Sequence, residues 1–372
     1  MKKYFVMAAL AVSTLTASAQ SVVPKWINNV KLSGFGIVQY TYNGQENNES
    51  NSFNLRLARL ALDGRAFDDW YWKAQIQFNG NTSTLGSSPK LVDIFIEWQK
   101  YDFLRVKAGQ FKNPFTYENP MHPIDQGFMS YSQVISKFAG FSDRAGAHSS
   151  NGRDIGVQLQ GDFLKNASGR NLIHYQVGVF NGQGINVKDV DQQKNIIGGA
   201  WVMPVEGMRL GAFGWIGSYA RKGTSASEGI TNTTLRRLQQ RRYAFSAEYK
   251  VDDWTFRSEY VHSTGYAFAK AMVNTNDASA KDITLSSNGD KSQGVYALVI
   301  APIIKKKCHA KARYDMYQPS KGAEKQRTQY EIGLDYYFNK NICLTGEYAY
   351  IHDRALADPN YSMIDVELSY RF

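Results

Sequence analysis

Basic side chains recur at every second position in several segments of the chain. Arg105 and Lys107 form one such pair, and Lys311 and Arg313 form another. In a β-strand, side chains two residues apart lie on the same face of the sheet. Rows of fixed positive charge along a water-filled path raise the local anion concentration and lower the barrier for an anion that sheds water. This spacing favours the guidance of anions, although each basic residue taken singly is equally compatible with a merely solvated polar face.

The residues that covalent or metal chemistry would need are scattered. The six histidines lie in no HExxH pattern, and no nucleophile-elbow motif or compact Ser/His/acid cluster occurs. Cys308 and Cys343 fall on different predicted strands and point to opposite faces, so we expect them to be unpaired. No cysteine or histidine spacing resembles a zinc or haem site. The sequence therefore predicts neither an enzyme nor a cofactor.

The elements that position the basic rows are strands of period 2. In residues 70–79, Trp72 and Ile76 alternate with Lys73 and Gln75. The terminal MIDVELSYRF alternates in the same way and ends on an aromatic residue. Helices would need apolar positions three and four apart, which these segments lack. We count about sixteen such strands, as in a porin-type barrel. The segments that fit this pattern least, with apolar residues on both faces, are 30–42, 53–63 and 208–218.

The connections between the predicted strands alternate between short and long. The short ones are AFDD, KYD, LKNASGR, PVEG, VDD, PIIKK and NKN. The long ones are predicted near residues 43–52, 80–89, 112–152, 181–194, 219–240, 266–291, 318–326 and 353–360. Sorting tight turns to one end and long loops to the other is typical of an outer-membrane barrel. The predicted fold is all-β: a transmembrane antiparallel up-and-down barrel of about sixteen strands, with the long third external loop, 112–152, folded into the pore as a constriction.

The start of the chain indicates export. Residues 1–19 combine a basic tip, a short apolar run and small residues, which predicts a signal peptide and a mature barrel domain of residues 20–372. The formal net charge is +10, of which Lys2 and Lys3 in the predicted leader supply two. A basic balance in an exported protein favours small anionic solutes and lipopolysaccharide as partners, and it argues against nucleic acid.

Four stretches of the sequence resemble the phosphate-selective porin O and P family. They are FNLRLARLALDG (53–64), VKAGQFKNPFTYE (106–118), GRDIGVQLQG (152–161) and the terminal aromatic of SYRF. The resemblance implies a sixteen-stranded homotrimeric porin whose channel selects anions through a ladder of arginines leading to a lysine-rich constriction. By position, the residues that match this basic lining are Arg105, Lys107, Arg144 and Arg153. Together with the basic rows, the residues expected to line the anion path are Lys73, Arg105, Lys107, Lys112, Arg144, Arg153, Lys311 and Arg313.

The sequence thus predicts an outer-membrane porin for passive diffusion of small hydrophilic solutes, with a preference for anions such as phosphate. Acidic residues on other strands, such as Glu331 and Glu347, give the lumen a mixed field. The alternative is a plugged or partner-binding barrel, for example an adhesin or a subunit of a complex. In that case the basic end of loop 219–240, with Arg236, Arg237, Arg241 and Arg242, would contact lipopolysaccharide phosphates.

Overall fold

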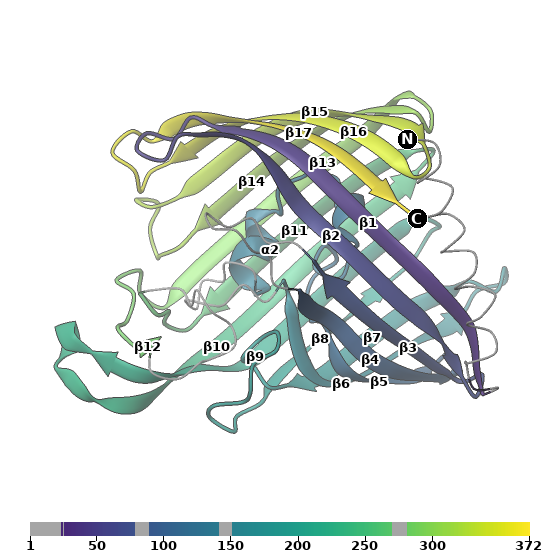
Figure 1. The fold of residues 1–372 in the computed structure, drawn as a ribbon, viewed down its shortest axis with the longest axis horizontal. Coiled ribbons are helices and arrows are strands. Elements are labelled where there is room, and N and C mark those ends of the chain that lie inside the picture. Colours follow the sequence, from purple (N-terminus) through teal and green to yellow (C-terminus); the bar gives the residue numbers. More distant parts are fainter. Residues whose placement is uncertain (1–23, 25, 79–88, 141–150, 270–280) are drawn as a thin grey trace, which may run out of the picture.

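The protein is a closed β-barrel (Figure 1). The computed structural model describes residue 24 and residues 26–78, 89–140, 151–269 and 281–372. Sixteen antiparallel strands follow chain order around the barrel, and β1 pairs with β17 to close it. The strands are β1 (Ile27–Asn43), β2 (Ser50–Ala66), β3 (Trp70–Gln77), β4 (Lys90–Tyr101), β5 (Leu104–Lys112), β6 (Arg153–Lys165), β7 (Asn171–Phe180), β8 (Asn195–Val202), β9 (Met208–Ser225), β10 (Ile230–Val251), β11 (Trp254–Thr264), β13 (Lys291–Ile304), β14 (Cys308–Gln318), β15 (Arg327–Asn339), β16 (Ile342–Asp353) and β17 (Asn360–Arg371), with the two-residue β12 (Lys281–Asp282) added in parallel to β9.

The predicted sorting of connections is confirmed. The turns β2–β3, β4–β5, β6–β7, β8–β9, β10–β11, β13–β14 and β15–β16 are short and lie at the end of the barrel where β1 begins and β17 ends. Most of the longer connections are at the opposite end. One prediction there was wrong, because residues 219–240 are mainly the outer part of the β9–β10 hairpin and not a loop. Beyond a membrane, a hairpin needs no apolar outer face, so its alternation fades.

The outside of the barrel is apolar and its inside is polar, as the alternation predicts. In β17, Val366 and Leu368 are 41% and 43% exposed. The residues that follow each of them, Glu367 and Ser369, are only 5% and 4% exposed. Phe372 is exposed on the same outer face. Closing the barrel pairs the backbone N–H and C=O groups of β1 and β17. Left unpaired, these groups would cost free energy in the hydrocarbon core of a membrane. None of the helices among the described residues is long and apolar enough to cross a membrane.

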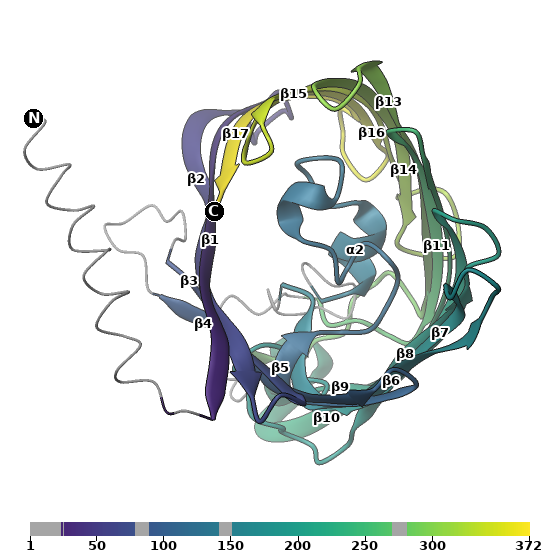
Figure 2. The ribbon, with the colours of Figure 1, turned by 90° about the vertical axis from the view of Figure 1, so that its right-hand side faces the viewer.

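Residues 113–140, which we call the lumen segment, lie inside the ring of strands (Figure 2). The segment contains the short helices η1 (Pro123–Asp125) and α2 (Gln133–Phe138); a third, η2 (Ala226–Glu228), connects β9 to β10. In α2, Ser132 caps the first turn by accepting a hydrogen bond from the Ile135 amide. The buried residues Val134 and Phe138 of α2 belong to an apolar core inside the barrel. A helix of this length has no sequence periodicity to detect, and the sequence did not predict it.

The apolar core explains the segments whose alternation was weak. Phe213 and Trp215 of β9 face inward and pack with Phe115 and Tyr117 of the lumen segment. Phe35, Ile37 and Leu57 of β1 and β2 likewise form an inward cluster against Ile124. These strands therefore carry apolar residues on both faces, one set towards the membrane and one set towards the lumen segment.

Candidate functional site

Three carboxylates of the barrel wall hold the backbone of the lumen segment. Glu259 of β11 accepts hydrogen bonds from the amides of Tyr117 and Glu118 at 2.7 and 2.9 Å. The same carboxylate accepts from the hydroxyls of Ser246 and Tyr296. Glu347 of β16 accepts from the Met129 amide at 3.0 Å, and Asp315 of β14 accepts from the Gln133 amide at 2.8 Å. All three of these acidic residues are buried.

Lys311 and Arg313, two of the predicted path residues, belong to this attachment. The Lys311 ammonium lies 2.8 Å from Asp335 and 2.7 Å from Glu347, and it donates a hydrogen bond to the Gly127 carbonyl. Arg313 pairs with Glu331 at 2.5 Å and donates to the Ser130 carbonyl. Both cations are therefore compensated by carboxylates, and their visible role is to fasten the lumen segment to β14–β16.

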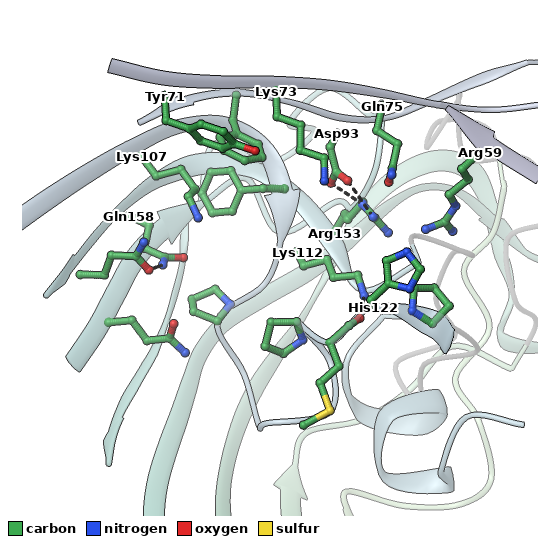
Figure 3. Close-up of a pocket in the computed structure, with 18 of the residues that line it drawn as sticks. Arg59, Tyr71, Lys73, Gln75, Asp93, Lys107, Lys112, His122, Arg153 and Gln158 are labelled. Carbon is green, nitrogen blue, oxygen red and sulfur yellow. Dashed lines mark hydrogen bonds and ion pairs between the residues drawn. The ribbon is translucent and has the colours of Figure 1, made fainter. Parts of the chain in front are cut away.

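A second group of predicted residues converges on a cavity between strands β2–β7 and the lumen segment (Figure 3). We call it the basic cavity; its volume is about 330 Å³. Five cations line it, and Asp93 is the one carboxylate among the lining residues that the structure describes. The cations are Arg59, Lys73, Lys107, Lys112 and Arg153. Figure 3 shows their side chains reaching into one space from neighbouring strands.

Only part of this positive charge is neutralised. Arg153 and Asp93 form a bidentate pair with nitrogen–oxygen distances of 2.7 and 2.9 Å, and the Lys107 ammonium lies 3.6 Å from Glu97. Lys112 donates to the Met121 carbonyl and thereby ties the cavity to the lumen segment. Arg59 and Lys73 have no carboxylate partner among the described residues, and neither does Lys112. The cavity therefore keeps a local excess of positive charge.

Other parts of the lumen lack this excess. A cavity of about 380 Å³ on the side of the short turns is lined by Arg56, Lys250 and Lys311 against Asp125, Asp253, Asp335 and Glu367. A third, of about 330 Å³, is lined by Arg56 and Arg327 against Glu331, Glu347 and Asp365. In both, carboxylates outnumber lysines and arginines. Among these three cavities of the described residues, the excess of positive charge thus belongs to the basic cavity, beside β2–β6.

The remaining predicted path residues lie outside the basic cavity or outside the described part of the chain. Arg105 forms an ion pair with Asp162, whose other oxygen lies 2.7 Å from Nδ1 of His174. Arg144 and residues 141–150 of the predicted constriction loop lie outside the described residues. The predicted signal peptide, residues 1–19, also lies outside them. Free Cys308 and Cys343 agree with the prediction that they are unpaired.

Arg59 and His122 were missed by sequence reasoning. Arg59 is 2% exposed, and its Nε donates to the Gln77 side chain at 2.9 Å. It lies in β2, where inward apolar residues obscured the alternation, but its spacing of two from Leu57 and Ala61 would have assigned it to the lumen face. His122 comes from the lumen segment, where no strand pattern indicates direction.

His122 is a neutral member of the cavity lining near pH 7. Its Nδ1 accepts from the Ile124 amide at 3.3 Å, and its ring packs edge-on against Phe35 with centroids 4.4 Å apart. Burial lowers the pKa of His122 to about 4, the Asp125 carboxylate opposes this shift, and the Lys112 cation adds to it. A positive charge therefore appears on His122 only as the pH falls through about 4.

We expect acidification to raise anion preference through His122. One additional charge about 6 Å from a passing ion in water changes its energy by roughly 0.7 kcal/mol, or about threefold in partition. Reversal potentials across a chloride gradient at pH 7 and pH 3.5 measure this, and His122→Gln serves as the reference that cannot charge. An identical pH response in the native protein and in His122→Gln would show that other groups cause it.

The closed barrel of sixteen strands, its apolar exterior and its polar, partly open lumen define the architecture of a porin. Residues 33–191 match the model of the family phosphate-selective porin O and P, which confirms the resemblance found in the sequence. The chain is a porin of the bacterial outer membrane, and it is a channel and not an enzyme. No curated protein matches the chain by sequence.

Solved porin structures share the fold at low sequence identity. An anion-selective porin from Comamonas acidovorans is similar with a TM-score of 0.63 and 14% identity, over 92% of this chain and 99% of that chain. OmpF of Salmonella typhi, in complex with daunomycin, gives a TM-score of 0.62 and 12% identity over 94% and 99%. The trimer form of OmpT from Vibrio cholerae is similar with a TM-score of 0.60 and 13% identity, over 92% of this chain and 99% of that chain. The sixteen-stranded barrel predicted from the sequence is thereby confirmed.

Proposed function

We propose that this porin prefers anions and that the basic cavity makes the selection. The observation that carries the proposal is the lining of five cations against one carboxylate, with Arg59, Lys73 and Lys112 free of any carboxylate partner among the described residues. An anion entering the cavity exchanges part of its hydration for guanidinium and ammonium N–H donors, whereas a cation meets repulsion. Similarity to a porin described as anion-selective supports the same reading.

The path residues then divide into two roles. Lys73, Lys107, Lys112 and Arg153, together with Arg59, contact the passing solute in the basic cavity. Lys311 and Arg313 position the lumen segment that forms the opposite wall. Arg105, held by Asp162, lies outside the cavity, and a role for Arg144 in the path stays a prediction.

Reversal potentials in planar bilayers test the proposal directly. Across a tenfold potassium chloride gradient, we expect the reversal potential to have the sign of the chloride equilibrium potential. A potential of the sign set by potassium would refute anion preference. The absence of any steady current would favour the plugged, partner-binding barrel, in which the lumen segment closes the path.

Two further proposals concern the surroundings of the barrel. We propose a homotrimer, supported by the family resemblance and by the trimer form of a similar porin. The mass of the native complex in detergent checks this proposal.

We also propose that Arg241 contacts lipopolysaccharide phosphate. Tyr243 lies on the outer face of the barrel, and Arg241 is exposed on the same face, two residues nearer the end with the long connections. Of the other three arginines, Arg236 pairs with Glu228, Arg237 pairs with Asp191 and Arg242 is buried. Weaker retention of lipopolysaccharide by Arg241→Gln than by the native protein checks this contact.

A further inference from the structure

The basic cavity has two unlike walls. The wall formed by the strands supplies the five cations, the side-chain amides of four glutamines and four aromatic rings; the glutamines are Gln75, Gln158, Gln160 and Gln176, and the rings are those of Phe35, Tyr71, Phe95 and Phe111. The wall formed by the lumen segment supplies Pro114, Pro120, Met121, His122 and Pro123. Proline has no backbone N–H, so this second wall presents mainly C–H surface. A small oxyanion would use the first wall and gain nothing from the second.

Several polar groups on the strand wall lack partners. The side-chain amides of Gln75 and Gln176 make no hydrogen bond with the rest of the described structure, although both residues are less than 10% exposed. One terminal nitrogen of Arg59 also has no hydrogen-bond acceptor there. Figure 3 shows Gln75 and Arg59 reaching into the same space as Lys73. Buried polar groups are normally paired, so these groups indicate a solute or ordered water as their partner.

The amides discriminate between kinds of anion. A glutamine side chain presents a donor and an acceptor together. A hydroxyl group matches both. Near pH 7 inorganic phosphate carries only one or two P–OH groups, on the same phosphorus atom whose other oxygens the cations hold, so it cannot present hydroxyls to amides on separate strands while its charge stays among the cations. Side-chain amides beside cations that lack a carboxylate partner among the described residues therefore favour a solute whose hydroxyls lie apart from its negative charge.

We infer that the basic cavity selects an anionic sugar, such as a sugar phosphate, over inorganic phosphate; this inference rests on the proposed function and deepens it. The anionic group lies among Arg59, Lys73 and Lys112, and the hydroxyls reach Gln75 and Gln176. The C–H face of the sugar ring packs on the proline wall of the lumen segment. The cavity volume of about 330 Å³ is within the range of roughly 300–1,000 Å³ that small organic ligands occupy.

Block of the chloride current by three probes tests the inference. Glucose 6-phosphate, inorganic phosphate and glucose are titrated at one pH and one ionic strength. We expect glucose 6-phosphate to reach half-block at a concentration about tenfold below that of phosphate, because its hydroxyls and ring add contacts, and glucose to block least.

Matched variants separate the side-chain amides of the strand wall from its charge. Gln75→Met and Gln176→Met keep the side-chain length and net charge, and we expect each to raise the half-blocking concentration of glucose 6-phosphate about three- to tenfold while phosphate changes less than about twofold. Lys73→Gln is expected to weaken block by both anions. Gln329→Met is the control, because Gln329 lines a different cavity. The shift in gel mobility on heating establishes that each variant forms a folded barrel.

The outcomes distinguish this inference from the proposed function. If the channel is anion-selective but phosphate and glucose 6-phosphate block equally, the sugar assignment is overturned and the proposed function stands. Stronger block by benzoate than by glucose 6-phosphate would assign the cavity to apolar anions and would likewise overturn it. A cation-selective reversal potential would overturn both.

Discussion

The double variant Arg59→Gln/Lys73→Gln is expected to lower the chloride-to-potassium permeability ratio at least about tenfold, because it removes two cavity cations that lack a carboxylate partner among the described residues. Each charge about 6 Å from a passing ion contributes roughly 0.7 kcal/mol in water, so two together contribute roughly 1.4 kcal/mol, which is a factor of about ten in anion partition. Loss of repulsion for potassium acts in the same direction. The reversal potential across a potassium chloride gradient measures the change.

Two control variants make this result specific to the basic cavity. Lys305→Gln removes one charge from an exposed turn outside the lumen, where Lys305 pairs loosely with Asp252, and should leave selectivity unchanged. Arg105→Gln removes a charge that lies outside the basic cavity, where Arg105 pairs with Asp162, so its effect should be smaller than that of either single variant in the cavity. Equal effects of Arg105→Gln and Lys73→Gln would show that selectivity follows the total lumen charge and is not set by the basic cavity.

Sequence reasoning predicted the barrel because one physical constraint acts on nearly every strand. Lipid outside and water inside impose period 2, which is visible in β17, where Val366 and Leu368 face out and Glu367 faces in. Where the lumen segment packs against the inner face of a strand, that face becomes apolar too, and the alternation in the sequence weakens. Phe213 and Trp215 face inward because the lumen segment packs on them, so β9 lost its alternation although it is a regular strand.

The site was predicted in part for a related reason. Alternation assigns Lys73 and Lys311 equally to the lumen, but it says nothing about which carboxylates lie beside them. Lys311 is compensated because β14, β15 and β16 bring Asp335 and Glu347 within 2.8 Å of its ammonium, and that arrangement depends on strand register. Lys73 lies opposite Asp63 in the β2–β3 pair, but it forms no ion pair with a carboxylate among the described residues. Separating the cations proposed to select anions from those that hold the lumen segment therefore required the positions of their partners.

Replacing Glu259 with leucine is expected to release the lumen segment from the barrel wall and to make the conductance of the channel unsteady. Glu259 accepts hydrogen bonds from two backbone amides of the segment and from the hydroxyls of Ser246 and Tyr296, and it is fully buried. Replacing it with leucine leaves these donors without an acceptor, and each unsatisfied buried donor costs about 1–3 kcal/mol. The total is comparable to the stability of a small folded unit, so we expect the segment to leave the wall for a large part of the time.

Single-channel recording and limited proteolysis detect this release. In Glu259→Leu we expect conductance to fluctuate between levels, and we expect cleavage within residues 113–140 of the folded barrel, because a detached segment becomes accessible to protease. Glu324→Gln, at an exposed position in the β14–β15 connection, is the matched loss of a carboxylate and should behave like the native protein. Ser246→Ala removes one donor but keeps the carboxylate, so it should retain a steady conductance. A steady, protease-resistant Glu259→Leu channel would mean that the apolar core of Phe115, Val134 and Phe138 holds the segment without the carboxylate.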